Sequence, residues 1–149
     1  MNIEEIPSGY AHCYATDEQC SQAAHCLRAQ AARLNETQPT PREHLHCVTP
    51  AYVARVAAGT TCAYFRPDTP LRYARGMRHL FDAIPRSSYS KIRDQVIRVF
   101  SSERIFYYAR KGEYLITPAQ QERILAIFAK ANLPTPQFDT YETGLSWEP

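Results

Sequence analysis

The cysteines are the residues whose number and spacing most strongly suggest chemistry. The chain has 149 residues, and all five of its cysteines lie within the first 62. Cys13, Cys20 and Cys26 lie close together in the sequence, and Cys47 and Cys62 follow. Thiolates bind zinc and iron–sulfur clusters. This concentration of thiols favours a metal site. The alternative is a set of buried free cysteines, which pack as small apolar groups.

The spacing shows how such a site would be built. Residues six apart on a helix differ by about 120° around its axis, so Cys20 and Cys26 cannot face one ion from a continuous helix. A loop carrying Cys13 and Cys20, followed by a helix that begins near Leu27, would bring three thiols together. Cys62 would then return as the fourth. We therefore predict that Cys13, Cys20, Cys26 and Cys62 bind a metal.

The identity of the metal stays open between zinc and an iron–sulfur cluster. Structural zinc sites most often use close pairs of ligands, with two to four residues between them, and this chain has no such pair. Wider gaps suit a cluster, and the spacing resembles the three-cysteine loops of iron–sulfur regulators of the Rrf-two type. Cys47 lies between Leu45 and Val48, which suggests simple burial. Whether it or a histidine also binds the metal is left open. The histidines that directly precede a cysteine are His12, His25 and His46.

The elements that must position these residues have mainly helical patterns. Apolar periodicity and capping residues predict helices over residues 22–34, 51–58, 71–84, 88–100, 102–111 and 118–132. The stripe of the third helix consists of Leu71, Ala74, Met77, Leu80, Phe81 and Ile84. We predict a mostly α fold. A Cys-rich metal-binding unit, residues 1–67, would pack on a four-helix, helix-turn-helix-like bundle, residues 68–149.

Charge is unevenly distributed along the chain, although the formal net charge is only +2. Residues 66–114 hold eleven Lys or Arg and five acids, a charge of +6, and both flanking segments are acidic. Clustered basic groups gain affinity for phosphates by releasing counterions. A solvated basic helix face is the other interpretation, and charge alone does not decide between the two.

Residues 91–133 resemble the helix-turn-helix of the lambda-repressor and Cro type. The motif rests on Ser101-Ser102 before a short helix, Gly112 after it, and the cap Thr117-Pro118. The resemblance implies that this short helix lies in the major groove of DNA. Its DNA-binding residues would be Ser102, Arg104, Tyr107, Tyr108, Arg110 and Lys111. Tyr107 and Tyr108 would also suit stacking on unpaired bases, whereas Phe106 is expected in the core.

The whole chain also resembles an uncharacterised, domain-of-unknown-function family of Bacteroidetes. The resemblance rests on the runs Cys26-Leu27-Arg28, Gly59-Thr60-Thr61-Cys62-Ala63-Tyr64-Phe65-Arg66 and Tyr107-Tyr108-Ala109-Arg110-Lys111-Gly112-Glu113, with Cys20, Phe138-Asp139-x-Tyr141 and Trp147. It implies a small bacterial protein and supplies no activity.

Together these features predict a metal-stabilised DNA-binding protein, a transcriptional regulator that could respond to redox state or iron. The alternative is a zinc-stabilised protein-interaction adaptor without DNA binding or catalysis. No paired carboxylates, phosphate loop or catalytic triad indicate an enzyme. We expect DNA as the partner, with a homodimer or a protein partner left open, and no membrane. The acidic start lacks the features of a signal peptide, so we expect a cytoplasmic protein with reduced thiols.

Overall fold

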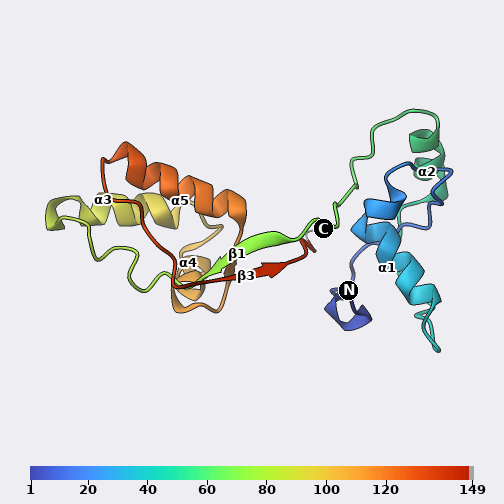
Figure 1. Ribbon diagram of the computed structural model, residues 1–149, viewed down its shortest axis with the longest axis horizontal. Coiled ribbons are helices and arrows are strands. Elements are labelled where there is room, and N and C mark those ends of the chain that lie inside the picture. Colours follow the sequence, from blue (N-terminus) through green and yellow to red (C-terminus); the bar gives the residue numbers. More distant parts are fainter. Residues whose placement is uncertain (148–149) are drawn as a thin grey trace. The chain divides into compact units, whose positions relative to one another are not determined.

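The chain forms two compact units, which Figure 1 shows in a computed structural model that describes residues 1–147. The first unit comprises residues 1–69 together with the segment that begins at Leu145. The second unit runs from Pro70 to Gly144. The chain therefore leaves the first unit, builds the second and then returns to the first. Each unit has its own buried apolar residues.

The fold is α+β, and the prediction of a mostly α protein is wrong. Residues 1–147 contain five α-helices and a three-stranded antiparallel sheet. The second unit combines three of these helices with the sheet, so the predicted four-helix, helix-turn-helix-like bundle is also wrong. The sheet depends on pairing between segments that are far apart in the sequence, which local periodicity does not reveal.

The first unit is built from short helical elements and extended segments. It contains the 3-10 helices η1 (Ile3–Glu5) and η2 (Ala23–His25) and the α-helices α1 (Leu27–Glu36) and α2 (Pro50–Ala57). Leu27 and Ala31 of α1 are buried in one cluster with Ile6 and Tyr10. The predicted cap of α2 is confirmed, because the Thr49 hydroxyl accepts a hydrogen bond from the backbone nitrogen of Tyr52.

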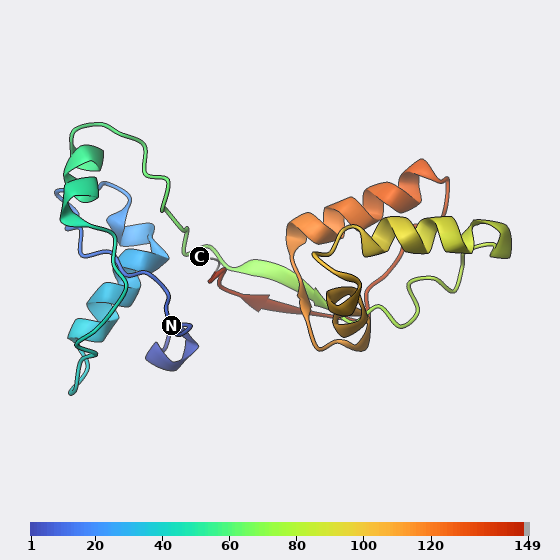
Figure 2. The same cartoon turned by 180° about the vertical axis from the view of Figure 1, so that it is seen from behind.

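The second unit places its helices beside the sheet, as Figures 1 and 2 show from opposite sides. Its elements are β1 (Leu71–Arg75), α3 (Arg86–Ile97), α4 (Glu103–Lys111), β2 (Leu115–Ile116), α5 (Pro118–Lys130) and β3 (Thr140–Gly144). The strand order is β2-β1-β3, and both pairings are antiparallel. Ala74 of β1 lies opposite Ile116 of β2 and Tyr141 of β3, which makes β1 the central strand.

The predicted helix over residues 71–84 does not form. Residues 71–75 are strand β1 instead, and the chain then turns through Gly76, whose φ is +83°. A side chain at Gly76 would collide with the carboxylate of Asp139, since a Cβ built there lies 2.9 Å from its Cγ. The turn therefore requires glycine for both its dihedral angle and its space. The apolar stripe predicted for this segment is nevertheless buried, from Ala74 through Ile84.

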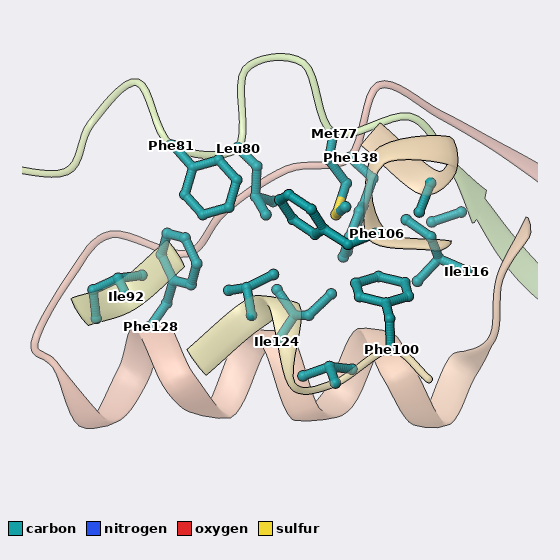
Figure 3. Packing of buried hydrophobic residues seen from close by; sticks show 14 of the residues in the cluster. Met77, Leu80, Phe81, Ile92, Phe100, Phe106, Ile116, Ile124, Phe128 and Phe138 are labelled. Atoms are coloured by element: carbon teal, nitrogen blue, oxygen red, sulfur yellow. The ribbon is translucent and has the colours of Figure 1, made fainter. Parts of the chain in front are cut away.

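The core of the second unit brings all three of its helices together around aromatic side chains (Figure 3). Phe106 of α4 is fully buried, and its ring centroid lies 6.2 Å from that of Phe81 and 6.0 Å from that of Phe100, with the rings inclined. Ile92 of α3 and Phe128 of α5 complete this layer. Burial of Phe106 fixes which face of α4 is turned to solvent.

The ends of α4 and α5 carry the caps that the sequence predicts. Ser102 accepts a hydrogen bond from the nitrogen of Ile105, and Gly112 ends α4 with a φ of +87°. Thr117 and Gln120 form the expected capping box at the start of α5. These local signals fix where the two helices begin and where α4 ends.

Candidate functional site

Four of the five cysteines line one narrow cavity in the first unit. Its lining includes Cys13, Cys20, Cys26 and Cys62, together with mainly apolar neighbours such as Phe65. The cavity holds about 20 Å³, which is enough for one water-sized species. These are the four positions that the sequence selected as ligands. Three of them lie close together in the sequence, and the folded chain brings the distant Cys62 to join them.

Backbone hydrogen bonds hold the segments that carry these thiols. The nitrogen of Cys13 donates to the carbonyl of Arg28 at 3.0 Å, and that of Leu27 donates to the carbonyl of Arg66 at 2.7 Å. Cys26 is the residue that precedes the first turn of α1. The helix predicted over residues 22–34 is wrong at its start, because residues 23–25 form the separate 3-10 helix η2. α1 begins at Leu27, as the convergence of the thiols required.

The pKa of the Cys13 thiol is shifted by burial and by the other thiols around the cavity. Burial raises the pKa of its thiol, and the neighbouring thiols of Cys26, Cys62 and Cys20 raise that pKa further, against a hydrogen bond with the backbone of Ala15. A group is harder to ionise away from water and near other groups that would carry the same charge. All five cysteines of the chain are free thiols.

The four thiols around this cavity are not arranged in a metal-binding geometry. Within residues 1–147, no group of three or more His, Cys, Asp or Glu is arranged so that it could hold a metal ion. The thiols thus surround a common space without converging on one point in it. The predicted metal-binding unit is not seen in this form of the chain, and metal binding by these four cysteines stays a prediction.

The other residues considered as ligands lie elsewhere or have other partners. His12 is buried and its Nδ1 lies 2.9 Å from the carbonyl oxygen of Tyr10, while burial lowers the pKa of its imidazole. His25 is paired with Asp68 at 3.4 Å. Cys47 does not line the cysteine cavity, and it is exposed rather than buried as its neighbours in sequence suggest.

Arg28 is the residue at this site that sequence reasoning missed. Its side chain is only 2% exposed. It lines the cysteine cavity, donating from Nε to the carbonyl of Tyr64 and from Nη1 to that of Ala11, each at 3.0 Å. It thereby ties α1 to the segment that follows Cys62. The run Cys26-Leu27-Arg28 was visible in the sequence, but its arginine gave no sign that it would be buried.

The polar face of α4 carries most of the residues predicted to bind DNA. At about 100° per residue, Arg104, Tyr107, Tyr108 and Lys111 lie on one side of the helix, opposite Phe106. Arg104 donates from Nε to the hydroxyl of Tyr108 at 3.0 Å. Arg104, Tyr107 and Lys111 are exposed. The structure therefore presents two basic groups beside an exposed aromatic ring.

Three further contacts occupy groups on or beside this face and reduce the number available to a ligand. The hydroxyl of Ser102 caps the helix. Arg93 of α3 donates to the hydroxyl of Tyr107 at 2.7 Å and lies 3.5 Å from Glu103, which places a third cation beside the ring. Arg110 is half-buried, with its guanidinium carbon 6.0 Å from the ring centre of Phe81. Arg104 and Lys111 are thus the residues of this face best placed to meet a phosphate.

The fold and these two sites define an α+β protein with a thiol-lined cavity in one unit and a basic aromatic helix in the other. The chain belongs to the family of unknown function DUF6078, which it matches over residues 1–147. No curated protein and no solved structure matches it. Within the described residues, the helices are too short or too polar to cross a membrane.

Proposed function

We propose that this protein binds DNA and that a single zinc ion, held by Cys13, Cys20, Cys26 and Cys62, stabilises its first unit. The observation that carries the proposal is the meeting of these four cysteines, and not the fifth, around one cavity. Packing accounts for two of them, because Cys26 is buried with Ala23 and Ala29 and Cys20 packs against that cluster. The proposal therefore rests on Cys13 and Cys62, which line the same cavity as this pair.

The size of the cavity favours one ion over a cluster. About 20 Å³ is available among the four side chains, close to the space of one water molecule. A zinc ion bonds each thiolate sulfur at about 2.3 Å in a tetrahedron. Two or more irons with bridging sulfides need a larger space than one ion does.

Such a zinc ion would have a structural role. Four thiolates leave no open position for water or substrate, and the energy of metal binding then becomes folding energy for a small unit. This contribution would add to a small core, since the buried apolar clusters of the first unit consist of Ile6, Tyr10, Leu27 and Ala31 and of Ala23, Cys26 and Ala29. Zinc would fix Cys62, and with it the segment that Arg28 holds.

DNA binding is assigned to the polar face of α4. Arg104 and Lys111 are exposed on one side of this helix, and residues 66–114 carry a charge of +6. Guanidinium and ammonium groups displace counterions from the phosphates of the duplex. Tyr107 is 40% exposed between the two basic residues and would contact sugar or base. The proposal rests on this face and requires no helix-turn-helix.

Elemental analysis of the purified protein tests the zinc site. We expect about one equivalent of zinc in the wild type and in Cys47→Ser, and little in Cys62→Ser, because Cys62 lines the cavity and Cys47 does not. Removal of zinc by a chelator should unfold the first unit. Trp147 reports this, since its ring packs 5.2 Å from that of Tyr10. Metal-free, folded wild-type protein or a brown protein that contains iron would contradict the proposal.

Duplex binding measured against salt concentration tests the DNA assignment. The variant Arg104→Ala/Lys111→Ala should lose about 1.8 units of the slope of log K against log salt if each group neutralises one phosphate. The control Arg86→Ala/Lys130→Ala removes the same charge from other exposed positions of the second unit and should bind like the wild type. Equal slopes for both variants, or no binding by the wild type, would remove the DNA assignment and favour a protein-interaction adaptor.

The place of the protein in the cell follows as part of the same proposal. Five free thiols suit a reducing compartment, so we assign the protein to the cytoplasm. A Bacteroidetes origin rests on the resemblance of the Cys26-Leu27-Arg28 run and the segments named with it.

A further inference from the structure

A second cavity in the first unit is much larger than the cysteine cavity and has a different character. It encloses about 490 Å³, within the range of about 300–1,000 Å³ that is typical of small-molecule sites. Its polar lining consists of Arg28, Cys47, Thr49, Tyr52, Arg55, Tyr64 and Arg66. These residues come from α1, α2 and the segments on either side of α2. The cavity shares Arg28, Val48 and Tyr64 with the cysteine cavity.

The charge of this cavity is entirely positive. Arg28, Arg55 and Arg66 line it, and no acidic side chain lies among the described residues of the lining. The acceptors of Arg28 are the neutral carbonyls of Ala11 and Tyr64, although its side chain is only 2% exposed. The guanidinium carbon of Arg28 also lies 4.6 Å from the ring centre of Tyr10. Guanidinium groups bind phosphate through paired hydrogen bonds, so a lining that carries three arginines and no acid suits an anion.

Two tyrosines give the cavity an aromatic wall. The ring centroids of Tyr52 and Tyr64 lie 4.9 Å apart with an interplanar angle of 72°. The hydroxyl of Tyr52 accepts a hydrogen bond from the nitrogen of Ala63 at 2.9 Å, which holds its ring in place. Tyr64 is 47% exposed, and the guanidinium carbon of Arg55 lies 5.1 Å from the ring centre of Tyr52. The guanidinium group of Arg55 thus lies next to the aromatic ring of Tyr52, which in turn lies against that of Tyr64.

We propose that this cavity binds a small molecule that joins a phosphate group to a planar ring, as a mononucleotide does. The phosphate would meet Arg28 and Arg55, and the ring would pack against Tyr64. Arginines alone would suit any small anion, and tyrosines alone any apolar ring. Their combination in one cavity of this volume selects a ligand with both parts. This proposal does not depend on DNA binding by α4, which belongs to the other unit.

Calorimetric titration of the purified wild-type protein tests this site, with the mononucleotides AMP, GMP, CMP and UMP as probes. We expect saturable binding of at least one of them with a Kd of about 1 mM or tighter. The matching nucleoside and inorganic phosphate should each bind at least about tenfold more weakly than the mononucleotide. The nucleoside lacks the phosphate group, and inorganic phosphate lacks the planar ring. No saturable binding of any mononucleotide, or equal affinity for inorganic phosphate, would overturn the proposal.

Matched variants separate this cavity from the rest of the protein. Arg55→Ala should weaken mononucleotide binding about tenfold or more, and its exposed position keeps the fold intact. Arg33→Ala, a change of equal charge in the same unit but outside the cavity, should leave binding unchanged. Arg104→Ala/Lys111→Ala should also leave it unchanged. If Arg55→Ala binds mononucleotides like the wild type, or if only Arg104→Ala/Lys111→Ala loses mononucleotide binding, this cavity is not the mononucleotide site.

Discussion

Replacing Tyr10 or Tyr52 by phenylalanine should change the stability of the first unit in opposite directions. The hydroxyl of Tyr10 is buried and has no hydrogen-bond partner among the described residues, whereas that of Tyr52 accepts from the nitrogen of Ala63. Replacing either tyrosine by phenylalanine removes one oxygen and retains the ring. The two variants therefore measure what each hydroxyl contributes, with the packing of the rings unchanged.

The magnitudes follow from the state of each oxygen. An unsatisfied buried polar group lowers stability by about 1–3 kcal/mol, and a typical hydrogen bond contributes about 0.5–1.5 kcal/mol. We expect Tyr10→Phe to raise the free energy of unfolding by about 1 kcal/mol and Tyr52→Phe to lower it by a similar amount. For a unit of this size, 1 kcal/mol corresponds to about 4–8 °C in Tm. The two variants should differ by about twice that shift.

Trp147 provides the assay. It is the only tryptophan of the chain, and its ring packs edge-on against that of Tyr10. Urea denaturation followed by its fluorescence therefore reports the first unit in both variants. The reasoning would be refuted if Tyr10→Phe proved as destabilising as Tyr52→Phe, because the Tyr10 hydroxyl would then have a partner in solution.

Three further predictions concern the second unit. Phe106→Ala should lower its free energy of unfolding by about 3–5 kcal/mol, as thermal unfolding by circular dichroism would show, and a loss below about 1 kcal/mol would place this ring outside a packed core. Gly76→Ala should destabilise the unit more than Gly112→Ala in the same assay. Both positions have positive φ, but only at Gly76 would the new Cβ collide with a neighbouring carboxylate; equal losses would contradict this. The hydrogen bond and charge of Arg75 lower the pKa of Glu142, so this carboxylate adds stability above its unfolded pKa, and that contribution is lost as pH falls through the lower, folded value. The Tm difference between the wild type and Glu142→Gln should therefore be largest near neutral pH and shrink as the pH falls below the ordinary pKa of a glutamate, and a difference that stays constant in acid would contradict it.

Local signals in the sequence predicted local structure well. The caps at Thr49, Ser102 and Thr117 and the left-handed Gly112 depend only on side-chain chemistry within one helical turn, and all four are confirmed. The burial of Phe106 is also confirmed. Such features can be predicted because the competing interactions lie within a few residues.

The sheet could not be predicted in the same way. Apolar residues at Leu71, Ala74 and Met77 fit a helical stripe, yet Leu71 and Ala74 pair across β1 with Gly144 and Tyr141. Pairing with a strand from the far end of the second unit decides the conformation, and Gly76 with Asp139 fixes the turn. Periodicity correctly indicated which residues are buried and failed on the backbone that buries them.

At the cysteine site, too, features set by nearby residues could be predicted and features set by the fold could not. Spacing indicated that Cys20 and Cys26 could not share a helix face, and the apolar neighbours of Cys47 set that residue aside. The fold brings the other four around one cavity. The exposed position of Cys47 and the larger arginine cavity were not foreseen. Arg28, Arg55 and Arg66 are widely spaced in the sequence with no repeating interval, so only the folded chain shows that they share a wall.

The return of the chain to the first unit after β3 has a consequence for the order of folding. Leu145 and Trp147 pack with the cluster of Ile6 and Tyr10, so the first unit is assembled from two stretches separated by the whole of the second. Leu145 and Trp147 are synthesised after all of residues 70–144, so the first unit cannot complete its interior until the whole of the second has been made. Its folding therefore ends later than the usual order, in which domains nearer the N-terminus fold first, would suggest.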